Sequence, residues 1–138
     1  MTRQTAIRAI ATIFLVAGVG HFASPTFFER IMPRWVPNAH AAVVWSGIAE
    51  ILGAIGLLVP ATRVAASWGL IALLVVVFPA NVQMLIAARE SGAPLLNVLV
   101  LVARLPLQPL MIWWVWRAGV RGYRPTAATG TGVDNGPS

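Results

Sequence analysis

Four long runs of apolar residues follow one another along the chain, separated by short segments rich in proline, arginine and small residues. The runs cover residues 5–22, 39–59, 63–88 and 94–117. Each is close to the ~20 residues that an α-helix needs to cross the hydrocarbon core of a bilayer. The runs lack the apolar–polar alternation of transmembrane strands, which argues against a barrel. The pattern therefore predicts an all-α fold, a four-transmembrane-helix bundle.

The segment between the first two runs has its own pattern. Ser24 followed by Pro25 is typical of a helix start, and Pro33 is a stop. Aromatic and charged residues lie between them, so we expect a short amphipathic interfacial helix between spans one and two. This helix could anchor the chain at the membrane surface or form a lid over a pocket, and the sequence leaves both open.

The two ends of the chain differ. The first run resembles a signal peptide, but His21 makes a poor cleavage site, so we expect a retained helix. Residues 123–138 have almost nothing to bury and are predicted to form a disordered tail. Residues 1–122 then form one four-helix transmembrane domain. The prolines inside the third and fourth runs, Pro79, Pro106 and Pro109, are tolerated in membrane helices.

Composition supports a membrane protein and narrows its chemistry. The chain has 138 residues, of which 58% are hydrophobic and 10% are charged, with a mean hydropathy of +0.78. A soluble domain usually carries roughly 25% charged residues. Since the chain has no cysteine, it cannot supply a disulfide, a thiol nucleophile or a cysteine-based metal site.

The net charge of +6 comes from arginines at the ends of the apolar runs. This distribution indicates membrane topology, with the lipid bilayer and its anionic headgroups as partners, and no nucleic acid. The excess of arginine on one side predicts that both termini are cytoplasmic. The arginines on that side are Arg3, Arg8, Arg63, Arg117, Arg121 and Arg124, against Arg30, Arg34 and Arg89 on the other.

Two charged residues lie deep inside apolar runs. Glu50 is near the middle of the second run, and Arg104 is near the middle of the fourth. A charge at the bilayer midplane costs at least ~2.5–3.5 kcal/mol, so such residues usually pair or line a polar pocket. Because their predicted depths agree, we expect Glu50 and Arg104 to form an ion pair, which is either purely structural or part of a functional site.

Three further polar residues fall at similar depths in the other spans or beside Arg104: His21, Asn81 and Gln108. Each could also have a purely structural role, since Asn81 and Gln108 could be interhelical hydrogen-bond partners and His21 could bond a backbone carbonyl. Small residues near them, including Gly18, Ser46, Gly47 and Gly53, allow helices to approach closely or leave room for a ligand. We therefore predict a ligand site formed by His21, Asn81, Arg104 and Gln108, with Glu50 and Arg104 as the catalytic pair if the chain is an enzyme.

Resident cofactors have little support. His21 and His40 both fall on the outer side and could in principle hold a haem, but no further ligand pattern accompanies them. No spacing of His, Asp or Glu indicates a metal, so we predict no metal site. We expect no cofactor held by the chain itself, although a quinone is possible.

Several short segments, in order along residues 5–118, resemble the DoxX-like family of small bacterial integral membrane proteins. They are Gly20-His21-Phe22, the region of Pro25 and Phe28, Pro33-Arg34-Trp35-Val36-Pro37, Ser46-Gly47-Ile48-Ala49-Glu50-Ile51-Leu52-Gly53, Val77-Phe78-Pro79-Ala80-Asn81 and Arg104-Leu105-Pro106-Leu107-Gln108. The resemblance implies a four-helix bundle in the bacterial plasma membrane. It also implies a redox-associated role, because the family takes its name from a subunit associated with a thiosulfate:quinone oxidoreductase.

Three functions stay open on the sequence. The first is an accessory or redox-associated subunit whose polar pocket binds a small lipophilic molecule, plausibly a quinone, together with a partner membrane or redox protein. The second is an intramembrane acid/base enzyme, an isomerase, cyclase or epoxide-opening enzyme, with Glu50 as the proton carrier. The third is a structural scaffold held by a Glu50–Arg104 pair.

Overall fold

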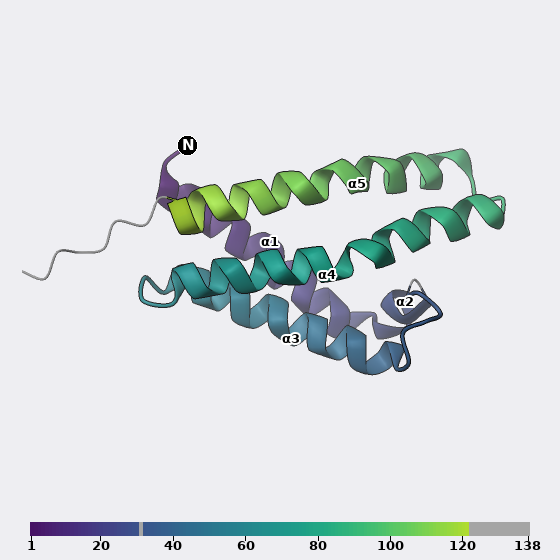
Figure 1. Cartoon of the computed structure of the whole chain (residues 1–138), viewed down its shortest axis with the longest axis horizontal. Helices are drawn as coiled ribbons and strands as arrows, with labels where there is room; N and C mark the ends of the chain where they lie inside the picture. The colour runs from purple at the N-terminus through teal and green to yellow at the C-terminus, as the bar shows by residue number, and fades with distance from the viewer. Residues whose placement is uncertain (31, 122–138) are drawn as a thin grey trace, which may run out of the picture.

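The computed structural model describes residues 1–30 and 32–121, and every regular element in this part of the chain is helical (Figure 1). The elements are α1 (Arg3–Ala23), α2 (Pro25–Arg30), α3 (Ala39–Leu58), α4 (Arg63–Glu90), α5 (Leu95–Val115) and the π-helical η1 (Trp116–Arg121). The predicted all-α fold is confirmed.

Four of these helices are long and apolar enough to cross a membrane: α1, α3, α4, and α5 continued through η1. Their bounds agree with the predicted runs to within a few residues at each end, because prolines and capping residues mark the boundaries. Thr2 accepts a hydrogen bond from the Thr5 amide at the start of α1, and Asn38 accepts one from the Ala41 amide at the start of α3. Gly92, with a φ of 67°, follows the end of α4.

The expected short helix between the first two spans is α2, which lies beside the start of α3 (Figure 1). An exposed contact joins them, since Nδ1 of His40 lies 2.7 Å from Oε1 of Glu29. The predicted disordered tail, residues 123–138, lies outside the described residues.

The helices pack in the order α1, α3, α4, α5, and η1 returns to contact both α1 and α4. The bundle is therefore closed at the end where the N-terminus and η1 lie, the terminal end (residues 1–8, 59–63 and 116–121). The buried core gathers toward this end: Ala6, Ile7, Ile10, Ala11, Phe14, Ala54, Leu57, Leu70, Val115 and Ala118.

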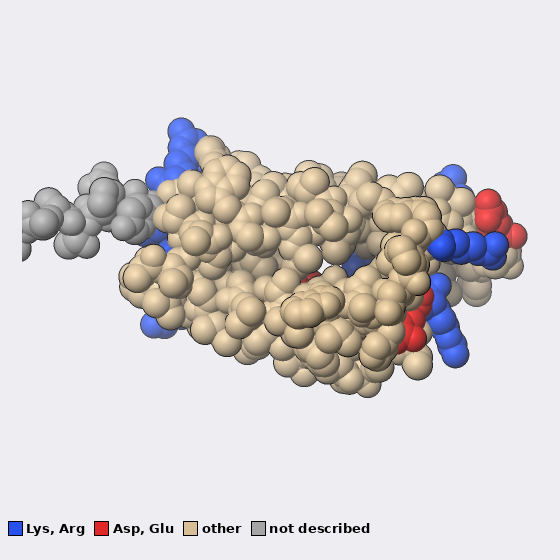
Figure 2. All heavy atoms as spheres, turned by 60° about the horizontal axis from the view of Figure 1, so that its bottom comes forward, with Lys and Arg blue, Asp and Glu red and all other residues tan. Residues whose placement is uncertain are grey.

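At the opposite end, the loop end (residues 23–30, 32–39 and 90–95), α4 and α5 diverge from α1 and α3 (Figure 1). Many apolar side chains of α4 and α5 in this half are exposed, among them Val76, Leu96 and Val100. Figure 2 shows charged side chains at the two ends of the molecule and a tan band between them. A hollow interrupts the band, and a red and a blue patch are visible inside it (Figure 2).

Candidate functional site

The diverging helices enclose a cavity of ≈ 340 Å³ in the loop-end half, here called the loop-end cavity. All four long helices and the segment after α1 contribute to its walls. Its lining residues are Ala17, His21, Phe28, Met32, Pro33, Trp35, Val36, Ala42, Ser46, Glu50, Val76, Val77, Ala80, Asn81 and Arg104. Most of this lining is apolar, and its ionisable residues are His21, Glu50 and Arg104.

The close approach of α1 and α3 at two glycines brings the first polar pair together. A Cβ added to Gly47 would lie 2.9 Å from His21 Cβ and 3.1 Å from the Gly18 carbonyl oxygen. A Cβ added to Gly18 would lie 2.9 Å from the Gly47 carbonyl oxygen and 3.1 Å from Glu50 Cβ. Because neither glycine has a side chain, the two backbones touch here, and the residues one turn further along each helix, His21 and Glu50, face each other.

The His21 imidazole and the Glu50 carboxylate form a compact dyad. Nδ1 of His21 lies 3.2 Å from Oε2 of Glu50 and 3.0 Å from the carbonyl oxygen of Ala17. The two side chains keep only 11% and 15% of their surface exposed. Nδ1 bonds the Ala17 carbonyl, and beyond its 3.2 Å contact with His21, Glu50 Oε2 is buried with no hydrogen bond among residues 1–30 and 32–121.

Phe28 covers the dyad from the side of α2. Its ring stacks on the His21 imidazole, with centroids 4.1 Å apart and an angle of 24° between the planes. Phe27 packs edge-on against Phe28. The residues after α2, including Pro33, Trp35 and Val36, continue this wall. The segment between the first two long helices therefore closes one side of the cavity, which is the position that a lid would occupy.

Arg104 lies on the wall formed by α5, and its side chain is exposed. The predicted Glu50–Arg104 ion pair is wrong: in the described part of the chain, Glu50 pairs with His21 and no acidic group pairs with Arg104. The physical reason is the order of the helices. α4 lies between α3 and α5, so equal depth along the bundle places Glu50 and Arg104 on facing walls of one cavity.

Asn81 and Gln108 join α4 to α5. Nδ2 of Asn81 donates a hydrogen bond of 2.6 Å to Oε1 of Gln108, and Nε2 of Gln108 donates to the carbonyl oxygen of Leu74. Gln108 is buried and lies behind the cavity wall, whereas Asn81 lines the cavity. This is the interhelical hydrogen bonding expected of Asn81 and Gln108 in a purely structural role.

Of the predicted site residues, the structure thus brings four to one cavity: His21, Glu50, Asn81 and Arg104. Gln108 lies behind the cavity wall, bonded to Asn81. His40 is exposed beside Glu29, outside the cavity. Sequence reasoning did not select Phe28 as a site residue. Its place one turn after Pro25, in a short helix that only Ser24 separates from the end of α1, is the signal that could have found it.

Comparison with known proteins gives a family. A family model described as "Domain of unknown function (DUF8561)" matches residues 10–119. The chain belongs to this family. The matched region runs from α1 into η1 and contains every residue of the loop-end cavity. No match was found among curated proteins or among solved structures.

Proposed function

We propose that this DUF8561 protein is a multi-pass membrane protein that binds a small lipophilic molecule in the loop-end cavity. The polar head of that molecule would lie between the His21–Glu50 dyad and Arg104, and its apolar part would lie along the valine and alanine side chains of α4. The volume of ≈ 340 Å³ falls in the range of ~300–1,000 Å³ that is typical of ligand sites.

The buried Glu50 Oε2 atom carries the proposal. Buried polar atoms in folded proteins nearly always have a hydrogen-bond partner, and one without a partner calls for an explanation such as a ligand. Within the described residues, Glu50 Oε2 makes no hydrogen bond and has only the 3.2 Å contact with His21 Nδ1. Glu50 lines the same cavity as Arg104, whose guanidinium has five N–H donors and no acidic partner in that part of the chain.

These two groups define the chemistry of the ligand head. A carboxylate accepts hydrogen bonds, so Glu50 favours a hydroxyl group, while Arg104 favours a carbonyl or phenolate oxygen. A quinone and its quinol present these groups on a flat, lipophilic ring. Glu50 would accept a hydrogen bond from the quinol hydroxyl, and Arg104 would donate to the oxygen on the other side of the ring.

A redox-associated or accessory role follows from that ligand class. The chain has no cysteine and would act with a partner membrane or redox protein that supplies the electron carriers. The resemblance to the DoxX-like family favours this role and a bacterial plasma membrane. Arginine at the terminal end favours cytoplasmic termini, so the loop-end cavity would open in the outer half of the bilayer.

The proposal is tested by binding of a short-chain quinone and its quinol to the purified full chain. Thermal unfolding and ligand titration are measured for the wild type, Arg104→Gln and Glu50→Gln. Loss of a hydrogen bond to a charged group costs ~1.5–3 kcal/mol, so each substitution should weaken binding by about tenfold to a hundredfold.

Matched controls lie at the loop end of α4. Arg89→Gln and Glu90→Gln remove the same charges from exposed positions outside the cavity, so their affinities should equal that of the wild type. Organic extracts of the purified protein, analysed by mass spectrometry, should contain a co-purified quinone or another lipophilic molecule. Absence of both the bound molecule and any thermal shift would reject the proposal.

A second function is favoured by the His21–Glu50 contact itself. A carboxylate 3.2 Å from an imidazole can pass a proton to or from a bound substrate, and Arg104 can stabilise negative charge that develops across the cavity. This is the intramembrane acid/base enzyme, acting as an isomerase, cyclase or epoxide-opening enzyme on an apolar substrate. Glu50→Gln would abolish turnover and leave binding of a substrate that lacks the reacting group nearly unchanged.

A further inference from the structure

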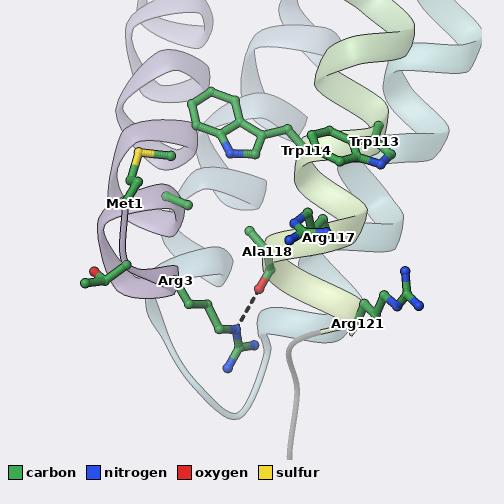
Figure 3. A pocket seen from close by; sticks show the side chains of 9 residues that line it. Met1, Arg3, Trp113, Trp114, Arg117, Ala118 and Arg121 are labelled. Atoms are coloured by element: carbon green, nitrogen blue, oxygen red, sulfur yellow. Dashed lines mark hydrogen bonds between the residues drawn. The ribbon is translucent and has the colours of Figure 1, made fainter.

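A second cavity, of ≈ 600 Å³, lies at the terminal end between the start of α1 and the end of α5 (Figure 3). Arginines and tryptophans dominate its lining. The lining residues are Met1, Thr2, Arg3, Ala6, Trp113, Trp114, Arg117, Ala118 and Arg121. This terminal-end cavity takes no part in the proposed function, and neither Arg3 nor the tryptophans line the loop-end cavity.

The three arginines of this cavity are held in place by their neighbours. Nε of Arg3 donates a hydrogen bond of 2.8 Å to the carbonyl oxygen of Ala118, which ties α1 to η1 (Figure 3). The Arg117 guanidinium lies 5.5 Å from the centre of the Trp113 ring, and the Arg121 guanidinium lies 5.3 Å from that of Trp116. Cation–π contacts of this length orient a guanidinium and leave its N–H edge free to bind.

The charge at this end has one sign. The ionisable side chains at the terminal end of the described chain are Arg3, Arg8, Arg63, Arg117 and Arg121, all basic. At the loop end, by contrast, Arg30, Arg34 and Arg89 are accompanied by Glu29 and Glu90. Arg63 is buried and donates to the carbonyl oxygens of Leu57 and Leu58, so it closes the end of α3 and is not available to an outside anion.

The tryptophans lie further along the bundle than the arginines. Trp113 precedes Arg117 by four residues, about one helical turn toward the apolar middle of α5. Figure 3 shows Trp114 reaching from α5 toward α1, with Arg3, Arg117 and Arg121 nearer the end of the bundle. A guanidinium layer followed by an indole layer matches the order of phosphate and upper acyl chain in a phospholipid.

We propose that the terminal-end cavity is a specific site for an anionic phospholipid, with the headgroup phosphate between Arg3, Arg117 and Arg121 and the glycerol–acyl region against Trp113 and Trp114. The phosphate accepts hydrogen bonds from guanidinium edges on both α1 and η1. Such a lipid would join α1, the first helix of the bundle, to η1, the last.

The test is native mass spectrometry of the full chain in detergent with phosphatidylglycerol and phosphatidylcholine of identical acyl chains. The wild type should retain phosphatidylglycerol preferentially. Each arginine near a lipid surface contributes about fivefold to affinity, so Arg117→Gln combined with Arg121→Gln should lower retention by about 30-fold. Both side chains are exposed, and thermal unfolding checks that the variant stays folded.

Arg30→Gln combined with Arg34→Gln is the matched control, because it removes the same charge at the loop end. It should leave retention unchanged, and an equal loss in both double variants would show diffuse attraction and overturn the proposal. Trp113→Leu keeps the charge and should also lower retention; unchanged retention would overturn the two-layer site. Inorganic phosphate and glycerol phosphate, each added alone, should not displace the lipid, and displacement by either would assign the site to a free anion.

Discussion

His21 Nδ1 lies 3.2 Å from Glu50 Oε2, and each residue follows by one turn the glycine at which its helix touches the other. The dyad is therefore a product of helix packing at Gly18 and Gly47. Anything that separates α1 from α3 at the glycines also separates the imidazole from the carboxylate.

Gly47→Ala should destabilise the protein by about 1–3 kcal/mol, the usual cost of inserting an extra carbon into a packed contact. The added Cβ would lie 2.9 Å from both His21 Cβ and Phe22 Cε2, so α1 must move away from α3. Thermal unfolding in detergent measures the loss of stability, and quinone titration measures the loss of the site.

Gly69→Ala is the control for this substitution, because a Cβ there meets no atom within 4 Å. It should leave stability unchanged or raise it slightly, since alanine favours a helix more than glycine does. If both variants lost the same stability, the close approach of α1 and α3 would not be what holds the dyad.

Glu50→Gln should raise the stability of the ligand-free protein while abolishing stabilisation by the ligand. A buried carboxylate oxygen without a donor costs ~1–3 kcal/mol or more, and the neutral amide lowers that cost. Thermal unfolding with and without the quinone measures both effects, with Glu90→Gln as the exposed control.

The opposite result would favour the scaffold hypothesis. If the carboxylate served only to hold α1 to α3 through His21, its removal would destabilise the ligand-free protein, and no added quinone would change the unfolding temperature of the wild type.

Gln108→Leu should lower the stability of the protein, and adding Asn81→Leu to that variant should lower it only slightly further. Gln108 bonds both Asn81 and the Leu74 carbonyl, so its removal breaks two contacts between α5 and α4. Side-chain hydrogen bonds between membrane helices average ≈ 0.6 kcal/mol in double-mutant cycles, so the Asn81–Gln108 coupling should be of this order. Asn97→Leu, at an exposed position in the first turn of α5, is the control. Additive effects of the two substitutions would contradict the contact.

Phe28→Ala should speed ligand release more than it weakens folding. Its ring stacks on His21 at 4.1 Å and forms part of the cavity wall, so its removal opens that side of the site. Stopped-flow displacement of a bound quinone measures the rate. Phe27→Ala removes an equal ring from an exposed position and should change the rate less; equal rates for the two variants would argue against α2 as a lid.

The positions of the helices were predictable because they depend on local properties of the sequence. Apolar runs of membrane length, the breaks at Pro60 and Pro94, and the Ser24-Pro25 pair mark where helices begin and end. The agreement in depth among His21, Glu50, Asn81 and Arg104 was also readable, because depth follows from the rise per residue.

The partner of Glu50 was not predictable from depth, because depth does not say which helices are neighbours. The decisive contact is between Gly18 and Gly47, and small residues occur at many other positions of this chain. Arg63 illustrates the same limit. It was counted as a headgroup arginine, but the short turn after α3 lets its side chain fold back onto the carbonyls of Leu57 and Leu58.

The two halves of the bundle differ in burial, so substitutions in them should have different effects. Substitutions among the tightly packed residues near Ile7, Leu57 and Val115 threaten folding, whereas Val76, which lines the loop-end cavity, is 72% exposed. Exchanges at Val76, Val77 and Ala80 should therefore change the shape of the loop-end cavity while the closed half keeps the architecture intact.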